Sequence, residues 1–242
     1  MIPQMVRRAV ILAAGKSQRL DSLKLNIPKP LINVAGRPLL VHHLERCAAQ
    51  GIEEVYINLH YLPEQIRDVV GDGSKWNLRV IYKYEVELMG TSGAVKSFSE
   101  YLQDAPFLVI YGDNYCTFAF EELILAHSRR DPRPDMSVVL FELEDVSGSG
   151  VAVCNQDGLI QSFIEKPAPG ATSSHWVNAG VYLMEPHLLN AIPGGMSDFG
   201  RDVIPSFLAS GKKILGVNTQ GRVYAVDTPE LLRNSAGIQS AT

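Results

Sequence analysis

Short apolar runs alternate with segments of helical periodicity through the first half of the chain. Residues 9–14 form one such run, which ends at Gly15, and residues 54–59 and 106–111 form others. Runs of this length are typical of strands that are buried on both faces of a parallel sheet. A further strand is expected over residues 78–84, and helices over 38–51, 63–70 and 92–102. The alternation predicts an α/β fold, a doubly wound sheet with helices on both faces.

The second half of the chain is richer in strand patterns. We expect strands over residues 136–143, 150–154, 159–164, 177–184, 213–217 and 222–226, with turns such as Gln156-Asp157-Gly158 between them. A helix is expected over residues 198–210, and a closing helix over 228–235. This strand-rich half is expected to extend the sheet, which makes the predicted sheet a mixed one.

Composition and charge exclude several classes of partner. The chain has 242 residues, of which 46% are hydrophobic and 20% charged, as in an ordinary globular protein. A net charge of −4 and a pI of about 5.9 favour neither nucleic acid nor an anionic membrane as a partner. No apolar run has the length of a signal peptide or a membrane span, and the three cysteines lack C-x-x-C spacing. We therefore expect a soluble, cytoplasmic protein with reduced thiols.

The turn after the first strand has the chemistry of a phosphate site. Gly15 lets a ligand approach the backbone, and Lys16, Ser17 and Arg19 follow it, with Lys29 held between two prolines. Cationic side chains and backbone N–H groups together suit several phosphate oxygens. The glycine spacings of a Walker A loop and of a dinucleotide fingerprint are both absent.

The pattern L-A-x-G-x-x-x-R-L followed by P-K-P resembles the sugar-phosphate nucleotidylyltransferases, the family that makes nucleotide sugars. The resemblance runs from Val10 to about Glu230 and is greatest to mannose- and heptose-1-phosphate guanylyltransferases. It implies a Rossmann-like domain of the nucleotide-diphospho-sugar transferase type over residues 1–242. Within it, the nucleotide-binding half would cover about 6–134, the sugar-phosphate-binding half about 135–227, and a closing helix 228–242.

The resemblance also implies which residues bind the nucleotide. Arg19 would hold the β- and γ-phosphates, Lys29 would stabilise charge on the α-phosphate, and Asp113 would bind Mg²⁺; these three are the expected catalytic residues. The nucleotide would contact the first turn, the G-T-S-G-A segment and the glycine before Asp113, that is Leu12, Ala13, Ala14, Gly15, Lys16, Ser17, Arg19, Lys29, Gly90, Thr91 and Gly112.

A second metal ligand is expected near the end of the chain. Aligning the usual W-x-D-x-G-T pattern on Thr228 places Ala225 at the aspartate, a departure from the family. The segment V-D-T-P-E also resembles related sugar-acid cytidylyltransferases, in which the aspartate binds metal. We therefore expect Asp227 to bind Mg²⁺ with Asp113; the alternative is that Asp227 caps the closing helix.

Two later motifs resemble the family's acceptor site. F-x-E-K-P implies that Glu165 binds sugar hydroxyls and that Lys166 holds the acceptor phosphate. N-A-G-x-Y implies that Asn178 contacts the sugar and that Gly180 lets the backbone approach the ring. The acceptor is therefore expected to be a sugar 1-phosphate, and the reaction to be nucleotidyl transfer from a nucleoside triphosphate, with GTP favoured.

Alternatives remain open at this point. The endings Gly112-Asp113-Asn114 and V-D-T-P-E also suit a cytidylyltransferase for a sugar or a phosphocholine-like acceptor. A different class of function is a catalytically silent regulatory module that binds nucleotide sugars, because Ala225 replaces a metal ligand. A homodimer would be common for this fold.

Overall fold

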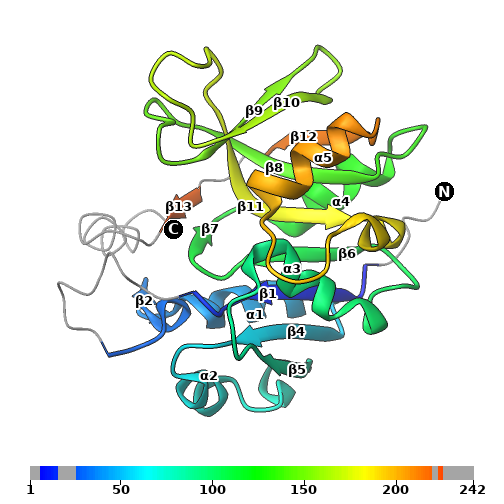
Figure 1. Cartoon of the computed structure of the whole chain (residues 1–242). Helices are drawn as coiled ribbons and strands as arrows, with labels where there is room; N and C mark the ends of the chain where they lie inside the picture. Colours follow the sequence, from blue (N-terminus) through cyan, green and yellow to red (C-terminus); the bar gives the residue numbers. More distant parts are fainter. Residues whose placement is uncertain (1–5, 16–25, 220–222, 226–242) are drawn as a thin grey trace. The chain divides into compact units, whose positions relative to one another are not determined.

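The computed structural model describes residues 6–15, 26–219 and 223–225 (Figure 1). These residues divide between two compact units. Unit 1 contains residues 6, 89–109 and 118–219, and unit 2 contains 7–15, 26–88, 110–117 and 223–225. Strand β6 (Phe107–Tyr111) contributes residues to both. The units are interleaved along the chain, whereas consecutive halves meeting near residue 134 were expected; that functional division stays a prediction.

Unit 2 is built on parallel strands that are joined by helices. β1 (Arg8–Leu12) pairs with β4 (Glu54–Leu59), and β4 pairs with β5 (Arg79–Tyr84), so that β4 is the middle strand of the three (Figure 1). The crossovers contain α1 (Leu39–Ala49) and α2 (Pro63–Val70). These strands and helices lie where the apolar patterns predict them. Each apolar run or helical stripe marks the residues of one element that are buried in the core.

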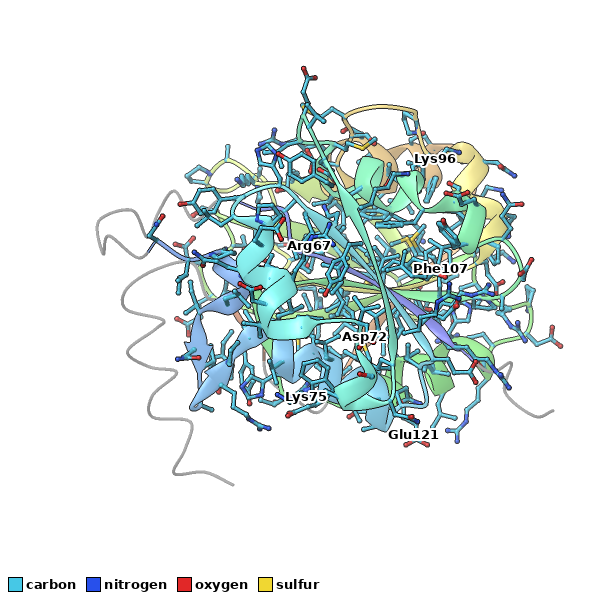
Figure 2. The ribbon with its side chains drawn as sticks, turned by 90° about the horizontal axis from the view of Figure 1, so that it is seen from below. Arg67, Asp72, Lys75, Lys96, Phe107 and Glu121 are labelled. Atoms are coloured by element: carbon cyan, nitrogen blue, oxygen red, sulfur yellow. The ribbon has the colours of Figure 1, made fainter. Side chains whose placement is uncertain are left out.

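Proline and glycine in the sequence set the two ends of α2 in unit 2. α2 begins at Pro63, whose missing N–H costs nothing in a first turn, and ends at Gly71 with a φ of 62°. Arg67 on α2 then lies over the ring of Tyr82, 4.7 Å from its centroid, and the turn beyond contains Asp72 (Figure 2). Smaller elements complete the unit: η2 (Lys29–Leu31), η3 (Ser74–Trp76), the pair β2 (Asn33–Val34) and β3 (Arg37–Pro38), and the pair β7 (Asn114–Cys116) and β13 (Val223–Ala225).

Unit 1 is dominated by antiparallel pairs. β9 (Gly150–Cys154) and β10 (Ile160–Glu165) form a hairpin, and β11 (Trp176–Met184) pairs with β8 (Met136–Glu142). β12 (Ile214–Asn218) runs parallel to β8. With the parallel strands of unit 2, this confirms the expected mixed α/β class with a strand-rich second half.

The helices of unit 1 depart from the expectation in two places. The helix expected over 92–102 is α3 (Gly90–Ser97) followed by the 3₁₀ turn η4 (Ser99–Tyr101). The helix expected over 198–210 is a π-helix, η6 (Phe199–Val203), followed by α5 (Ile204–Ala209). Pro205 in the first turn of α5 has no N–H to donate, so a regular α ladder cannot run through it. The remaining helices are α4 (Phe120–Ser128) and η5 (Pro186–Ala191).

Candidate functional site

The end of β1 is held by buried side chains of the neighbouring strands in unit 2. The N–H of Ala13 donates to Oδ1 of Asn58 at 2.8 Å, and Nδ2 of Asn58 donates to Oε1 of Glu85 at 2.9 Å. Asn58 and Glu85 are each 3% exposed. This bridge fixes the backbone immediately before Gly15, where a Cβ would meet nothing within 4 Å. The sequence analysis missed both residues, although Asn58 is a polar interruption in an apolar strand.

The carbonyl of Leu12 accepts the N–H of Gly112 at 2.9 Å. A Cβ at Gly112 would lie 2.6 Å from that carbonyl oxygen, so only glycine fits here without a shift. The structure therefore brings the glycine before Asp113 against the end of β1, as expected for two strands that end at the same edge of a sheet.

Lys29 and Asp113 form an ion pair in unit 2. Lys29 Nζ lies 2.7 Å from Asp113 Oδ2, and the two side chains are 13% and 40% exposed. Pro28 in an extended conformation and Pro30 in the first turn of η2 restrict the backbone around Lys29. Two residues predicted independently, from P-K-P and from the end of β6, are thus in direct contact.

The groups buried behind Asp113 are uncharged near neutral pH. Burial lowers the pKa of His43 to about 3, and burial raises the pKa of Cys116 to about 12. Cys116 is therefore a buried thiol rather than a nucleophile, and neither group adds charge next to the Lys29–Asp113 pair.

The segment 223–225 returns to the residues next to Asp113. β13 pairs antiparallel with β7, and Ala225 lies opposite Asn114. The expected second ligand Asp227 lies outside the described residues, as do Lys16, Ser17, Arg19 and the closing helix. Within the described part of the chain, no three His, Cys, Asp or Glu side chains lie together as a metal cluster.

Glu165, at the end of β10 in unit 1, packs against glycine backbone. A Cβ at Gly200 would lie 2.3 Å from Glu165 Oε2, and one at Gly150 would lie 2.7 Å from it. Burial raises the pKa of Glu165, and Asp198 adds to that rise, while Lys166 and Arg201 oppose it. The carboxylate therefore lies in a recess that two glycines leave open.

Lys166 has an uncommon backbone conformation. Its φ is 51°, in the left-handed region, although it is not a glycine and precedes Pro167, which favours extended backbone. Its N–H donates to Ser149 O at 2.9 Å, which helps to hold this conformation. Residues held in such regions cluster at functional sites, so the conformation is consistent with a functional lysine.

Asn178 organises a bulge in β11. Its Oδ1 accepts the N–H of Gly180 at 2.9 Å, and its Nδ2 donates to the hydroxyl of Tyr182 at 2.7 Å. Gly180 has a φ of 70°, and the register of β11 against β8 shifts between Asn178 and Tyr182. The predicted pair thus shapes one irregular turn of backbone, while contact of either residue with a sugar stays a prediction.

Gly90 and Thr91 open α3, as expected, but the Thr91 hydroxyl is already engaged. It accepts the N–H of Phe199 at 2.8 Å and donates to Asp198 Oδ1 at 3.2 Å. The expectation that Thr91 contacts the nucleotide therefore stays a prediction, and the observed role of its hydroxyl is to attach α3 to Asp198 and Phe199. Asp198 and Arg201 were missed because their partners are distant in sequence.

Parallel strands joined by helices, with glycine and charged residues after the strand ends, define a nucleotide-binding α/β protein. The chain belongs to the nucleotidyl transferase family, whose model matches residues 8–224. Within the described residues, no helix is long and apolar enough to cross a membrane.

Two curated proteins with similar sequences are named as mannose-1-phosphate guanylyltransferases. The chain is 30% identical over 226 residues to the mannose-1-phosphate guanylyltransferase catalytic subunit beta of Drosophila pseudoobscura pseudoobscura, covering 92% of this chain and 60% of that protein. It is 33% identical over 233 residues to the mannose-1-phosphate guanylyltransferase of Mycobacterium tuberculosis, covering 95% and 64%. The chain thus spans about three fifths of the length of these curated relatives.

One solved structure matches at nearly full length. The crystal structure of HddC from Yersinia pseudotuberculosis, also solved in complex with GMP-PN, superposes with a TM-score of 0.80 at 26% identity, covering 96% of this chain and 99% of that one.

Proposed function

We propose that this chain transfers a guanylyl group from GTP to a sugar 1-phosphate and releases pyrophosphate. The observation that carries the proposal is the Lys29–Asp113 ion pair after the strand ends of unit 2, beside the Gly112 contact with β1. The names of the two guanylyltransferases support guanine as the base and mannose 1-phosphate as an acceptor, and the GMP-PN complex of HddC supports a guanine nucleotide.

In the proposed reaction, an oxygen of the acceptor phosphate attacks the α-phosphorus of GTP. The new P–O bond forms as the bond to the leaving group breaks, and pyrophosphate departs with the electron pair. A phosphate monoester is largely dianionic near neutral pH, because its second pKa is ~6, so the protein need not supply a base. Lys29 would stabilise charge on the α-phosphate, Arg19 would hold the β- and γ-phosphates, and Lys166 would align the attacking phosphate.

The residues present fit a divalent cation. Asp113 is 40% exposed and its carboxylate already contacts a cation, the Lys29 ammonium. Mg²⁺ commonly uses one or two protein carboxylates and takes its other ligands from phosphates and water. Ala225 pairs with Asn114, the residue after Asp113, and Asp227 is two positions later in the sequence, which supports Asp227 as the second carboxylate. When bound, the ion would neutralise phosphate charge.

A screen of pyrophosphate release tests the proposal. The four nucleoside triphosphates are each combined with a panel of sugar 1-phosphates that includes mannose 1-phosphate, with phosphocholine as a further acceptor. We expect turnover with GTP and a sugar 1-phosphate, and large losses in Arg19→Ala, Lys29→Ala and Asp113→Ala. Lys75→Ala, at an exposed lysine of η3 in the same unit, is the matched control.

Other outcomes of that screen decide between the alternatives. Turnover with CTP alone would overturn guanylyl transfer in favour of cytidylyl transfer. Nucleotide-dependent thermal stabilisation without turnover would favour the regulatory module. Near-wild-type rates in all three variants would rule out the assigned residues. A cytoplasmic location and a homodimer also stay proposals, and light scattering of the purified chain would test the second.

A further inference from the structure

The first turn of α3 is capped by a segment more than a hundred residues away in the sequence. Ser197 O accepts the N–H groups of Ser92 and Gly93 at 3.0 and 3.2 Å, and Asp198 Oδ1 accepts the N–H of Thr91 at 3.2 Å. The residue before the helix, Met89, provides no side-chain cap. The amides that would otherwise bind an anion at a helix N-terminus are therefore already satisfied from within unit 1.

Side chains add a second layer to this attachment. Thr91 Oγ1 donates to Asp198 Oδ1 at 3.2 Å and accepts the N–H of Phe199 at 2.8 Å. The hydroxyls of Ser92 and Ser197, both buried, lie 2.8 Å apart. A threonine hydroxyl has a single proton to donate, and Thr91 gives it to Asp198. Thr91 therefore joins α3 to the first residue of η6.

Glycines make the close approach of the two segments possible. A Cβ at Gly90 would lie 2.4 Å from Ser197 O, and one at Gly93 would lie 2.2 Å from Gly195 O. At the other end of α3, Lys96 Nζ donates to Leu189 O at 2.6 Å; Figure 2 labels Lys96 on this helix. Both ends of α3 are thus attached to the segment that runs from η5 to the start of η6.

The segment that contains Asp198 and η6 also lies close to Glu165, the residue expected to bind the acceptor. Gly200, the second residue of η6, faces Glu165 Oε2 so closely that a Cβ would lie 2.3 Å away. Asp198 is near enough to contribute to the raised pKa of Glu165. Within unit 1, one short segment therefore contacts both the turn expected to bind the nucleotide and the carboxylate expected to bind the sugar.

We propose that Asp198 is a positioning residue, which, through Thr91 and η6, couples nucleotide binding at Gly90–Thr91 to acceptor binding at Glu165. The inference rests on the proposed function, because it takes GTP and a sugar 1-phosphate as the two ligands. A nucleotide that contacts the α3 turn will, through these hydrogen bonds, also stabilise the observed position of η6 and Gly200, so the acceptor will find Glu165 already in place. Such coupling is reciprocal, so the acceptor will tighten nucleotide binding by the same factor.

The test is a thermodynamic cycle measured by calorimetry on the full chain. The Kd of mannose 1-phosphate is measured with and without a GTP analogue that cannot be cleaved between the α- and β-phosphates. We expect the analogue to tighten acceptor binding at least about 5-fold in the wild type. The ratio should fall close to one in Asp198→Ala and Thr91→Val, which break the link, and should be largely kept in Thr91→Ser, which retains the hydroxyl. Glu100→Ala, on the neighbouring turn η4, is the control and should keep the wild-type ratio.

Steady-state kinetics supplies a readout that a purely structural role would not move. In the link variants the KM for the acceptor should rise several-fold, while kcat at saturating acceptor changes less. If Asp198→Ala or Thr91→Val does not fold, Asp198→Asn keeps the side-chain volume and an acceptor oxygen, and its ratio should still be reduced because its hydrogen bonds lack the charge.

The two levels of the proposal fail differently. Wild-type turnover combined with an unchanged coupling ratio in the variants overturns the role of Asp198 and leaves the proposed function standing. A ratio of one in the wild type, which means that the analogue does not change the Kd of mannose 1-phosphate, also overturns the role of Asp198 and leaves the proposed function standing. A wild type without turnover or ligand binding overturns both.

Discussion

Two of the candidate sites, the Lys29–Asp113 pair of unit 2 and Glu165 of unit 1, are held by different means. In unit 2, side chains contact side chains: Lys29 faces Asp113 across 2.7 Å, and Asn58 hydrogen-bonds Glu85. In unit 1, Glu165 instead packs against bare backbone at Gly150 and Gly200. The difference indicates that the Lys29–Asp113 pair and Asn58 are most sensitive to the loss of a charge or a polar group, whereas Glu165 is most sensitive to added volume.

The largest expected effect is the removal of the Lys29 charge. Lys29→Ala should lower the rate of pyrophosphate release about 10²–10³-fold, the usual cost of losing one group that stabilises transition-state charge. Lys29→Arg should keep part of the rate, because it retains the cation but changes its shape. Thermal unfolding should move little in either variant, since the ion pair is partly exposed. An unchanged rate of pyrophosphate release in Lys29→Ala would contradict the role of Lys29 in stabilising charge on the α-phosphate.

Asn58 tests the buried polar bridge in the same unit. Asn58→Ala should lower the free energy of unfolding by about 2 kcal/mol, because the N–H of Ala13 and the carboxylate of Glu85 both lose a buried partner. It should also raise the KM for the nucleotide, since the backbone before Gly15 is no longer fixed. Urea unfolding and initial rates measure the two effects. Asn33→Ala, at an exposed position of β2, should change neither.

Gly200 tests the role of volume in unit 1. A methyl group at this position would displace the Glu165 carboxylate, since its carbon would lie 2.3 Å from Oε2. Gly200→Ala should therefore raise the KM for the acceptor about tenfold, the equivalent of losing ~1.4 kcal/mol of hydrogen bonding, with the KM for the nucleotide little changed. Gly148→Ala is the matched control, because nothing lies within 4 Å of its added carbon. If Gly200→Ala and Gly148→Ala have the same KM for the acceptor, acceptor binding does not depend on the recess around Glu165.

The smallest expected effect is a change in how stability depends on pH. Burial raises the pKa of Glu165 above its ordinary value of 4.5, so its contribution to stability is full below pH 4.5 and is lost as the pH rises through the raised pKa. Glu165→Gln does not titrate, so its stability relative to the wild type should improve as the pH rises from about 4 to 7. Urea unfolding over that range measures the difference.

Glu185 provides a control of opposite sign. A hydrogen bond from His127 lowers the pKa of Glu185, so its contribution is present above pH 4.5 and is lost as the pH falls through the lowered pKa. Glu185→Gln should therefore lose stability relative to the wild type as the pH rises. Parallel trends in the two variants would show that burial does not control Glu165.

Much of the fold could be predicted from the sequence because the apolar patterns are local. Strands β4 and β9 and helix α2 match their expected bounds, and the other expected strands differ by a few residues at most. The strand expected over residues 222–226 is β13, but its pairing with β7 was missed, because β7 has only three residues and the pattern of one strand does not identify a partner far away in the chain.

The candidate site residues also divide into those that a local motif predicts and those that depend on distant contacts. P-K-P and G-D are motifs, so Lys29 and Asp113 could be assigned from the sequence, and the structure shows that they meet. The attachment of Thr91 to Asp198 spans 107 positions, and the recess at Gly200 depends on the approach of β10, so no local pattern contains either one. Residues that act through distant partners become visible only once the chain is folded.

The amide of Asn58 has a consequence for how sequences in the family can diverge. It offers an acceptor to Ala13 and a donor to Glu85 at once, and neither a carboxylate nor an ammonium group offers both. A substitution at residue 58 that offers only a donor or only an acceptor therefore breaks one of these two hydrogen bonds. The two positions are expected to covary, even though residue 58 lies in β4 and residue 85 follows the end of β5.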